Sequence, residues 1–187
     1  MGKSISFRNL QRSDFPMLQR WLSAAHVAVW WNDCFDWESL EAKYGPRIDG
    51  ADPTHIFVVM HEREPIGWIQ WYLWTDYPEH ARQLGAGSES AGIDLAIGEL
   101  EMTGLGLGPA IIREFLDRFV FTNSNVRAVL TDPEESNARS LRALEKAGFQ
   151  MVKTVQLIGE ACRRQVLRLD RVEEPRFHAT SPSSRNP

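Results

Sequence analysis

Hydrophobic residues along this chain follow two spacings, the alternation typical of strands and the wider period typical of helices. Alternation over 5–8 predicts a first strand. Apolar residues at helical spacing then predict an amphipathic helix with Ser13 as its N-cap. A second helix is expected over 37–44, and Gly45 and Pro46 should end it.

The rest of the chain continues this succession of strands and helices. Two β-rich runs, 54–61 and 66–74, predict a hairpin, and the missing periodicity of 75–91 predicts a long loop. The later segments predict strand, helix, strand, helix and two closing strands, over 92–98, 109–121, 126–130, 137–146, 151–157 and 164–169. This order predicts an α/β fold with a mixed sheet.

Composition and charge narrow the class of protein. The 187 residues suffice for one domain, and 43% hydrophobic with 25% charged residues is typical of a soluble globular protein. We expect a single domain over 1–174 and a flexible tail over 175–187. The net charge of −4 disfavours a nucleic-acid partner and is compatible with a cationic substrate.

Cysteine use and apolar runs indicate the compartment. Cys34 and Cys162 lie far apart and form no metal-binding or redox motif, so we expect a reducing, cytoplasmic location and no metal. The N-terminus shows no secretory signal, and the longest apolar run, 66–74, is far too short to span a membrane. Monomer and homodimer both stay open.

The glycine-rich segment 103–108 (Thr-Gly-Leu-Gly-Leu-Gly) carries the strongest chemical signal. It lies between a predicted strand and a predicted helix, where glycines let backbone N–H groups approach an oxyanion and the helix dipole favours negative charge. Pro109 is tolerated because its missing N–H would have no partner within the helix. A tight glycine turn without a ligand is the plain alternative.

Other nucleotide-binding motifs fit this segment worse. A P-loop would end in Gly-Lys-Ser or Gly-Lys-Thr, which does not occur here. A dinucleotide fingerprint needs Gly-x-Gly-x-x-Gly, but its third position is Pro109 counted from Gly104 and Ile111 counted from Gly106. Asp132, at the end of the next predicted strand, does imitate the ribose-binding acid of that fold.

The chain resembles the GNAT family of N-acetyltransferases in the order and spacing of several motifs. These are the glycine turn and, about thirty residues later, Asn137, Leu141 and 145–149 (Glu-Lys-Ala-Gly-Phe). From about Phe7 to Leu169, the chain is similar to the aminoglycoside 6′-N-acetyltransferases of that family, in segments 26–31, 64–70, 92–94 and 131–133. The resemblance implies a GNAT-like α/β fold, with a mixed, mostly antiparallel sheet flanked by helices. It also implies an acetyl-CoA-dependent enzyme that inactivates a polycationic antibiotic.

The resemblance further implies which residues bind each substrate. Acetyl-CoA would meet the strand before the turn, the turn and the next helix, at Ile97, Gly98, Thr103, Gly104, Leu105, Gly106, Leu107, Gly108 and Asn137. The aminoglycoside would meet acidic and aromatic residues, at Trp31, Tyr44, Asp52, Gln70, Tyr72, Glu79, Asp94 and Asp132. Each of these assignments has a plain alternative. Trp31 and Tyr72 could equally be core residues, and Asp52 and Glu79 could be solvent-exposed charges in loops. His26 is interpreted as a histidine at a helix end rather than a catalytic residue.

Two residues depart from the family pattern. Thr103 stands where relatives usually have Gln or Arg, so one side-chain contact to phosphate is missing. Leu144 stands where many relatives have a tyrosine acid that protonates the departing thiolate. Because a thiol has a pKa of about 8.5, its thiolate is a tolerable leaving group, and losing the acid lowers the rate by about 10²–10⁴ without excluding the reaction.

Acyl transfer to an amine requires the substrate ammonium to lose a proton before attack. A nearby carboxylate can bind the ammonium and accept that proton. Asp94, on the strand before the turn, is our candidate catalytic base, and Asp132 should face the same cleft. The plain alternatives are a strand-end carboxylate for Asp94 and a turn residue for Asp132.

Three functions therefore stay open. The leading hypothesis is acetylation of the 6′-amine of aminoglycosides. The second keeps the fold but acetylates another primary amine, such as a siderophore precursor or a protein N-terminus. The third is a CoA-binding sensor that has lost catalysis, which Leu144 suggests.

Overall fold

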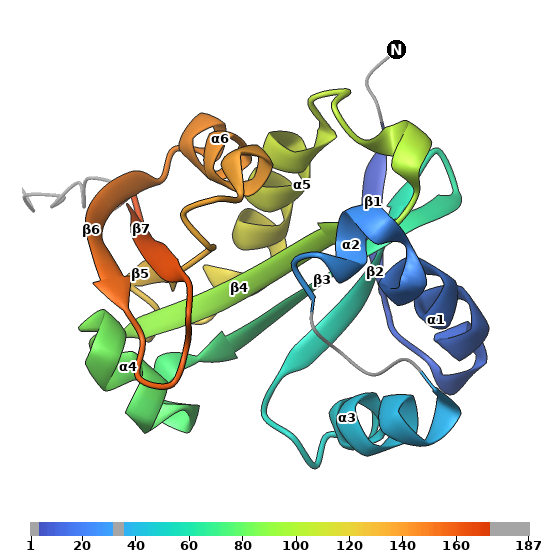
Figure 1. The fold of residues 1–187 in the computed structure, drawn as a ribbon, viewed down its shortest axis with the longest axis horizontal. Coiled ribbons are helices and arrows are strands. Elements are labelled where there is room, and N and C mark those ends of the chain that lie inside the picture. The colour runs from blue at the N-terminus through green and yellow to red at the C-terminus, as the bar shows by residue number, and fades with distance from the viewer. Residues whose placement is uncertain (1–3, 32–35, 173–187) are drawn as a thin grey trace, which may run out of the picture.

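The computed structural model describes residues 4–31 and 36–172, which form a seven-stranded sheet in the order β1-β2-β3-β4-β5-β7-β6 (Figure 1). Its strands are β1 (Ile5–Asn9), β2 (His55–His61), β3 (Glu64–Leu73), β4 (Ser90–Ile97), β5 (Ala128–Thr131), β6 (Gln150–Gln156) and β7 (Arg163–Asp170). All neighbours are antiparallel except β4 and β5, which are parallel. The predicted mixed, mostly antiparallel sheet is confirmed. Cys34 and the predicted tail lie outside the described residues.

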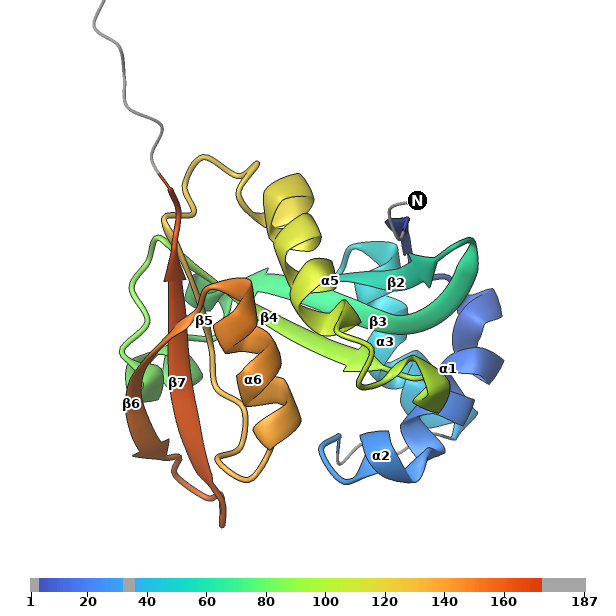
Figure 2. The same ribbon diagram turned by 90° about the horizontal axis from the view of Figure 1, so that it is seen from above.

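Helices cover both faces of this sheet (Figures 1 and 2). They are α1 (Phe15–Ser23), α2 (Ala25–Ala28), α3 (Trp37–Asp49), α4 (Pro78–Leu84), α5 (Leu107–Phe115) and α6 (Ala138–Ala147). On one face, α5 and α6 bury apolar side chains against Ile93 and Val129. On the other, α1 and α3 pack around Trp68, and α4 packs near Leu130. No helix in these two stretches of chain is long and apolar enough to cross a bilayer.

The prediction that Gly45 and Pro46 end the second helix is wrong. Helix α3 continues through both residues to Asp49 and ends at Gly50, whose φ of 73° is left-handed. The Arg12 guanidinium holds Glu41 at 2.7 Å and Asp49 at 2.7 Å, so it ties together the turns on either side of the proline. Tertiary contacts therefore override the local helix-breaking signal.

The predicted long loop over 75–91 is also wrong, because most of it is helical. A 3-10 turn over Trp74–Asp76 leads into α4, which has Pro78 at its first position and Gly85 in a left-handed C-terminal cap. Ala81 and Leu84 are buried against the sheet, so this segment contains a short amphipathic helix that was not predicted from the sequence.

Two predicted helix boundaries move. Ser13 is not the N-cap of α1, because Asp14 occupies that position and accepts a hydrogen bond from the backbone N–H of Gln11 at 2.9 Å. The helix expected over 109–121 starts slightly earlier as α5 and changes to a π-helix over Leu116–Val120.

The sheet splits between β4 and β5, and this split positions the site. The two strands pair only from Ser90 to Gly92, opposite Ala128 to Leu130, whereas β4 continues to Ile97. Beyond Gly92, β4 therefore presents one backbone edge to an opening rather than to a neighbouring strand.

Candidate active site

A cavity of about 620 Å³ opens where β4 and β5 separate, a volume within the usual range for small-molecule sites. Its walls come from α2 and the residues after it, the second half of β4, the glycine turn, the end of β5 and α6. The predicted site residues that line it are Trp31, Asp94, Ile97, Thr103, Gly104, Gly106, Leu107, Gly108, Asp132 and Asn137. The predicted residues outside its lining are Tyr44, Asp52, Gln70, Tyr72, Glu79, Gly98 and Leu105.

The glycine turn places N–H groups at one end of the cavity. Gly104 and Gly106 both have a φ of 75°, and a Cβ on either would meet no atom within 4 Å. Their left-handed backbone, rather than crowding, therefore favours glycine. Gly108 differs, because a Cβ there would lie 3.3 Å from that of Ala143 in α6. Gly106 precedes α5, so the first N–H groups of that helix, which have no helical partners, lie at the cavity wall.

Three cations of α6 also line the cavity, and the sequence reasoning missed them. Arg139, Arg142 and Lys146 are exposed and follow one another at spacings that put them on one helix face. That spacing was visible in the sequence and would have found them. Together with the glycine turn, these charges make this part of the cavity suited to phosphate groups.

The free edge of β4 offers amide-binding groups along the cavity. The Thr131 hydroxyl donates to the Ile93 carbonyl at 3.2 Å, and His26 Nε2 lies 3.1 Å from the Ile97 carbonyl oxygen. Because alternate residues of a strand point the same way, Leu95 presents its N–H and C=O to the same opening. Asn137 caps α6 by accepting the N–H of Ser140 at 3.1 Å.

Asp94 lies at the floor of the cavity, on the side of β4 that faces α3. Gln70 Nε2 donates a hydrogen bond to its Oδ2 at 2.7 Å. The Asp94 side chain is partly open to the cavity, but its carboxyl group is surrounded by protein. This burial raises the pKa of Asp94 above its ordinary value. A raised pKa makes the carboxylate a stronger proton acceptor.

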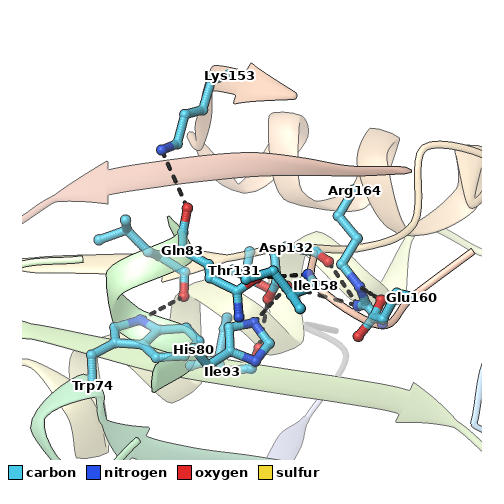
Figure 3. A network of polar contacts seen from close by, with 11 residues as sticks. Trp74, His80, Gln83, Ile93, Thr131, Asp132, Lys153, Ile158, Glu160 and Arg164 are labelled. Atoms are coloured by element: carbon cyan, nitrogen blue, oxygen red, sulfur yellow. Dashed lines mark hydrogen bonds and ion pairs between the residues drawn. The ribbon is translucent and has the colours of Figure 1, made fainter. Parts of the chain in front are cut away.

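Asp132 is buried and already has two basic partners, His80 and Arg164 (Figure 3). His80 Nε2 lies 2.9 Å from its Oδ2, and this hydrogen bond raises the pKa of His80. Arg164 Nη1 donates to the Asp132 carbonyl at 3.0 Å and lies 3.8 Å from Oδ2, while Arg164 Nε holds Glu160 at 2.5 Å. A substrate cation at Asp132 would therefore share it with His80.

Tyr72 lies just behind the cavity, across Gly92. A Cβ on Gly92 would come within 2.4 Å of the Tyr72 ring, so this glycine makes room for the aromatic side chain. Burial raises the pKa of Tyr72 strongly, and the negative charges of Asp94 and Asp132 raise it further. The phenol is therefore held neutral beside two carboxylates.

The remaining predicted residues fall into two groups. Trp31 lines the cavity with its ring centroid 5.1 Å from that of Trp68, whereas Gly98 is covered by Trp21. Tyr44 is fully buried in the core, and Asp52 accepts the N–H of Thr54 at 2.7 Å. Glu79 is exposed and pairs with Arg82 at 2.9 Å. Leu105 is exposed within the glycine turn.

Leu144 lines the cavity and is only 4% exposed. The chain has three tyrosines, Tyr44, Tyr72 and Tyr77, and none of them belongs to the cavity lining. A tyrosine acid for the departing thiolate is therefore missing from this site, as the sequence indicated.

Comparisons with known proteins agree with this geometry. Residues 11–157 match the family model described as acetyltransferase (GNAT) domain. The aminoglycoside N(6′)-acetyltransferase type 1 of Klebsiella pneumoniae is 28% identical over 155 residues, which is 81% of this chain and 77% of that protein. A kanamycin resistance protein of Rhizobium radiobacter is 38% identical over 64 residues, or 34% of this chain and 58% of that protein.

A solved structure shares the overall fold. The crystal structure of an aminoglycoside acetyltransferase in complex with coenzyme A and kanamycin superposes with a TM-score of 0.73 at 26% identity, covering 90% of this chain and 95% of that one. The family model spans most of the chain. The resemblance seen in the sequence is thus confirmed, and the chain belongs to the GNAT family of acetyltransferases.

Proposed function

We propose that this protein transfers the acetyl group of acetyl-CoA to the 6′-amine of an aminoglycoside and so confers antibiotic resistance. One observation carries the proposal, which is that a single cavity combines N–H groups and cations with the carboxylates of Asp94 and Asp132. The first set suits a pyrophosphate, and the second suits a polycationic amine. The related aminoglycoside acetyltransferases support this substrate class.

In the proposed mechanism, Asp94 binds the substrate ammonium and takes one of its protons, directly or through water. The amine then has a lone pair for attack. Bound acetyl-CoA supplies the acetyl group as a thioester, whose C–S bond breaks as the C–N bond forms and whose sulfur leaves as a thiolate. The nitrogen loses its second proton to water, which leaves a neutral amide. The edge of β4 and Asn137 hold the amide-bearing arm, and the glycine turn holds the phosphates.

The thiolate takes its proton from water, because Leu144 has none to give. A thiol pKa of about 8.5 makes the thiolate only moderately basic, so solvent can protonate it near neutral pH. This predicts a slower enzyme than a relative with a tyrosine acid, by at most about 10²–10⁴.

The test is to mix the protein with acetyl-CoA and kanamycin or tobramycin and to follow thiol release. We expect turnover, a product acetylated at the 6′-amine by NMR, and a loss of about 10²-fold or more in Asp94→Asn. Absence of thiol release with every aminoglycoside tried would refute the substrate assignment.

Leu144 also favours a second candidate, a CoA-binding sensor without catalysis. That protein would bind acetyl-CoA tightly and release no thiol with aminoglycosides, polyamines or peptide N-termini. Thiol release with a primary amine other than an aminoglycoside would instead identify a different substrate for the same reaction. The single domain over 1–174, the cytoplasmic location and the oligomeric state stay predictions.

A further inference from the structure

Arg47, in the part of α3 that follows Pro46, reaches toward the proposed base. Its Nη1 donates to Gln70 Oε1 at 2.9 Å, and Gln70 Nε2 donates to Asp94 Oδ2 at 2.7 Å. Gln70 and Asp94 are direct partners in the register of β3 and β4, so the amide meets the carboxylate without a bend in either strand. The arginine side chain is only 13% exposed.

The two hydrogen bonds of Gln70 fix the orientation of its amide. A guanidinium can only donate and a carboxylate can only accept, so the amide oxygen must face Arg47 and the NH₂ must face Asp94. The reversed amide would set two donors against each other on one side and two oxygens on the other. The Gln70 amide occupies Oδ2 of Asp94, and we assign Oδ1 to the substrate.

We propose that Arg47 is a positioning residue for Asp94 and acts on it through the Gln70 amide. This inference rests on the proposed role of Asp94 as the base. Arg47 touches neither the cavity nor the substrate. It aligns the amide that aims the carboxylate, and its positive charge favours the ionised carboxylate that must accept a proton.

Arg47 is itself held by two residues that the sequence placed in the substrate site. Its guanidinium carbon lies 5.5 Å from the centroid of the Tyr44 ring, a cation–π arrangement. Its Nε lies 3.7 Å from Asp52 Oδ1, and Asp52 is fixed by the backbone N–H of Thr54 at 2.7 Å. Tyr44 and Asp52 thus support the base from behind rather than line the cavity.

The charges around Asp94 show what the loss of Arg47 would do. Burial raises the pKa of Asp94, and the hydrogen bond from Gln70 lowers it. The charged and titratable groups that face Asp94 come from α3, from β3 and from the end of β5, namely Arg47, Lys43, Tyr72 and Asp132. Arg47 and Lys43 lower its pKa and Asp132 raises it, so removing Arg47 moves the pKa of Asp94 further upward.

The experiment uses the full chain and two substitutions at one position. Arg47→Met keeps the apolar stem but loses charge and hydrogen bond, and we expect kcat to fall about tenfold or more, as for a hydrogen bond to a charged group. The KM for acetyl-CoA should not change, and the acid limb of the kcat/KM profile should move to higher pH. Arg47→Lys keeps the charge without the planar fork, so kcat should fall while the acid limb stays in place.

A matched control tests whether any lost arginine contact at α3 has the same effect. Arg12→Met removes an arginine that bridges Glu41 and Asp49 on the outer side of α3. This variant should lose some thermal stability and keep the wild-type kcat and pH profile. Equal changes in Arg12→Met and Arg47→Met would show a merely structural role and overturn the proposal.

A double-mutant cycle tests the route through the amide. In a Gln70→Leu background, Arg47→Lys should have little further effect on kcat, and a full additional loss would refute positioning through Gln70. Titration of the Asp94 carboxyl by carbon NMR needs no turnover and should show a higher pKa in Arg47→Met. An unchanged Asp94 titration in Arg47→Met overturns the relay, whereas full activity of Asp94→Asn overturns the proposed base itself.

Discussion

Gly106→Ala isolates the contribution of the glycine turn to acetyl-CoA binding. Gly106 has a φ of 75° and open space around its Cα, so an added methyl group clashes with nothing and acts only through the backbone. A left-handed conformation costs about 1–2 kcal/mol for a residue with a Cβ. The variant either bears that cost as lost stability or lets the turn relax away from its N–H arrangement.

Gly50→Ala is the matched control, because Gly50 has a φ of 73° and equally open surroundings at the end of α3. Both variants should lower the melting temperature by about 2–8 °C. Only Gly106→Ala should weaken acetyl-CoA binding in calorimetry, by about tenfold or more if one N–H contact to a phosphate is lost. The cost of the left-handed conformation must appear either as lost stability or as lost affinity, so a wild-type melting temperature together with wild-type affinity in Gly106→Ala would refute this reasoning.

Three further predictions concern residues that line the cavity or contact its lining. Arg142→Gln and Lys146→Gln should each raise the KM for acetyl-CoA about two- to fivefold, and less at high salt, which steady-state kinetics at two ionic strengths will check. The hydrogen bond to Asp132 raises the pKa of His80 above its usual value of about 6.5, so its contribution to stability is complete below that pH and is lost as pH rises through the higher, folded-state pKa. His80→Gln should therefore destabilise the protein more at pH 6 than at pH 9 in urea unfolding, and an equal effect at both would contradict the pair. Leu144→Tyr should raise kcat at saturating substrates about tenfold or more if thiolate protonation limits turnover, and an unchanged kcat would show that water suffices.

The sequence predicted the parts of this fold whose signals are local. Hydrophobic spacing predicted the strands. The glycine spacing predicted the turn, because glycine is the residue that adopts a left-handed backbone at least cost. The prediction of α3 failed because Arg12, distant in sequence, stabilises the helix across Pro46. That error also hid Arg47, which lies in the part of the helix that was expected to be absent.

The candidate site could likewise be predicted only where its signals are local. Asp94 was predicted from its place on the strand before the glycine turn and Asp132 from its place at the end of the next strand, and both line the cavity. The pairing of Gln70 with Asp94 depends on the register of β3 and β4, and the contact of His80 with Asp132 depends on how α4 packs. Neither follows from composition or periodicity, because each joins segments that are far apart along the chain.

The split between β4 and β5 connects the two parts of the proposed site, which lie on opposite faces of the sheet. Ile93 packs on the face covered by α5 and α6, where the glycine turn and the cations lie, whereas Asp94 points to the opposite face, toward α3. In the proposed complex, the phosphates and the amine would thus lie on opposite sides of one sheet. The thioester must reach the amine through the opening beyond Gly92, where β5 no longer pairs with β4. If the two strands stayed paired along β4, the same residues would be present and the reacting atoms could not meet.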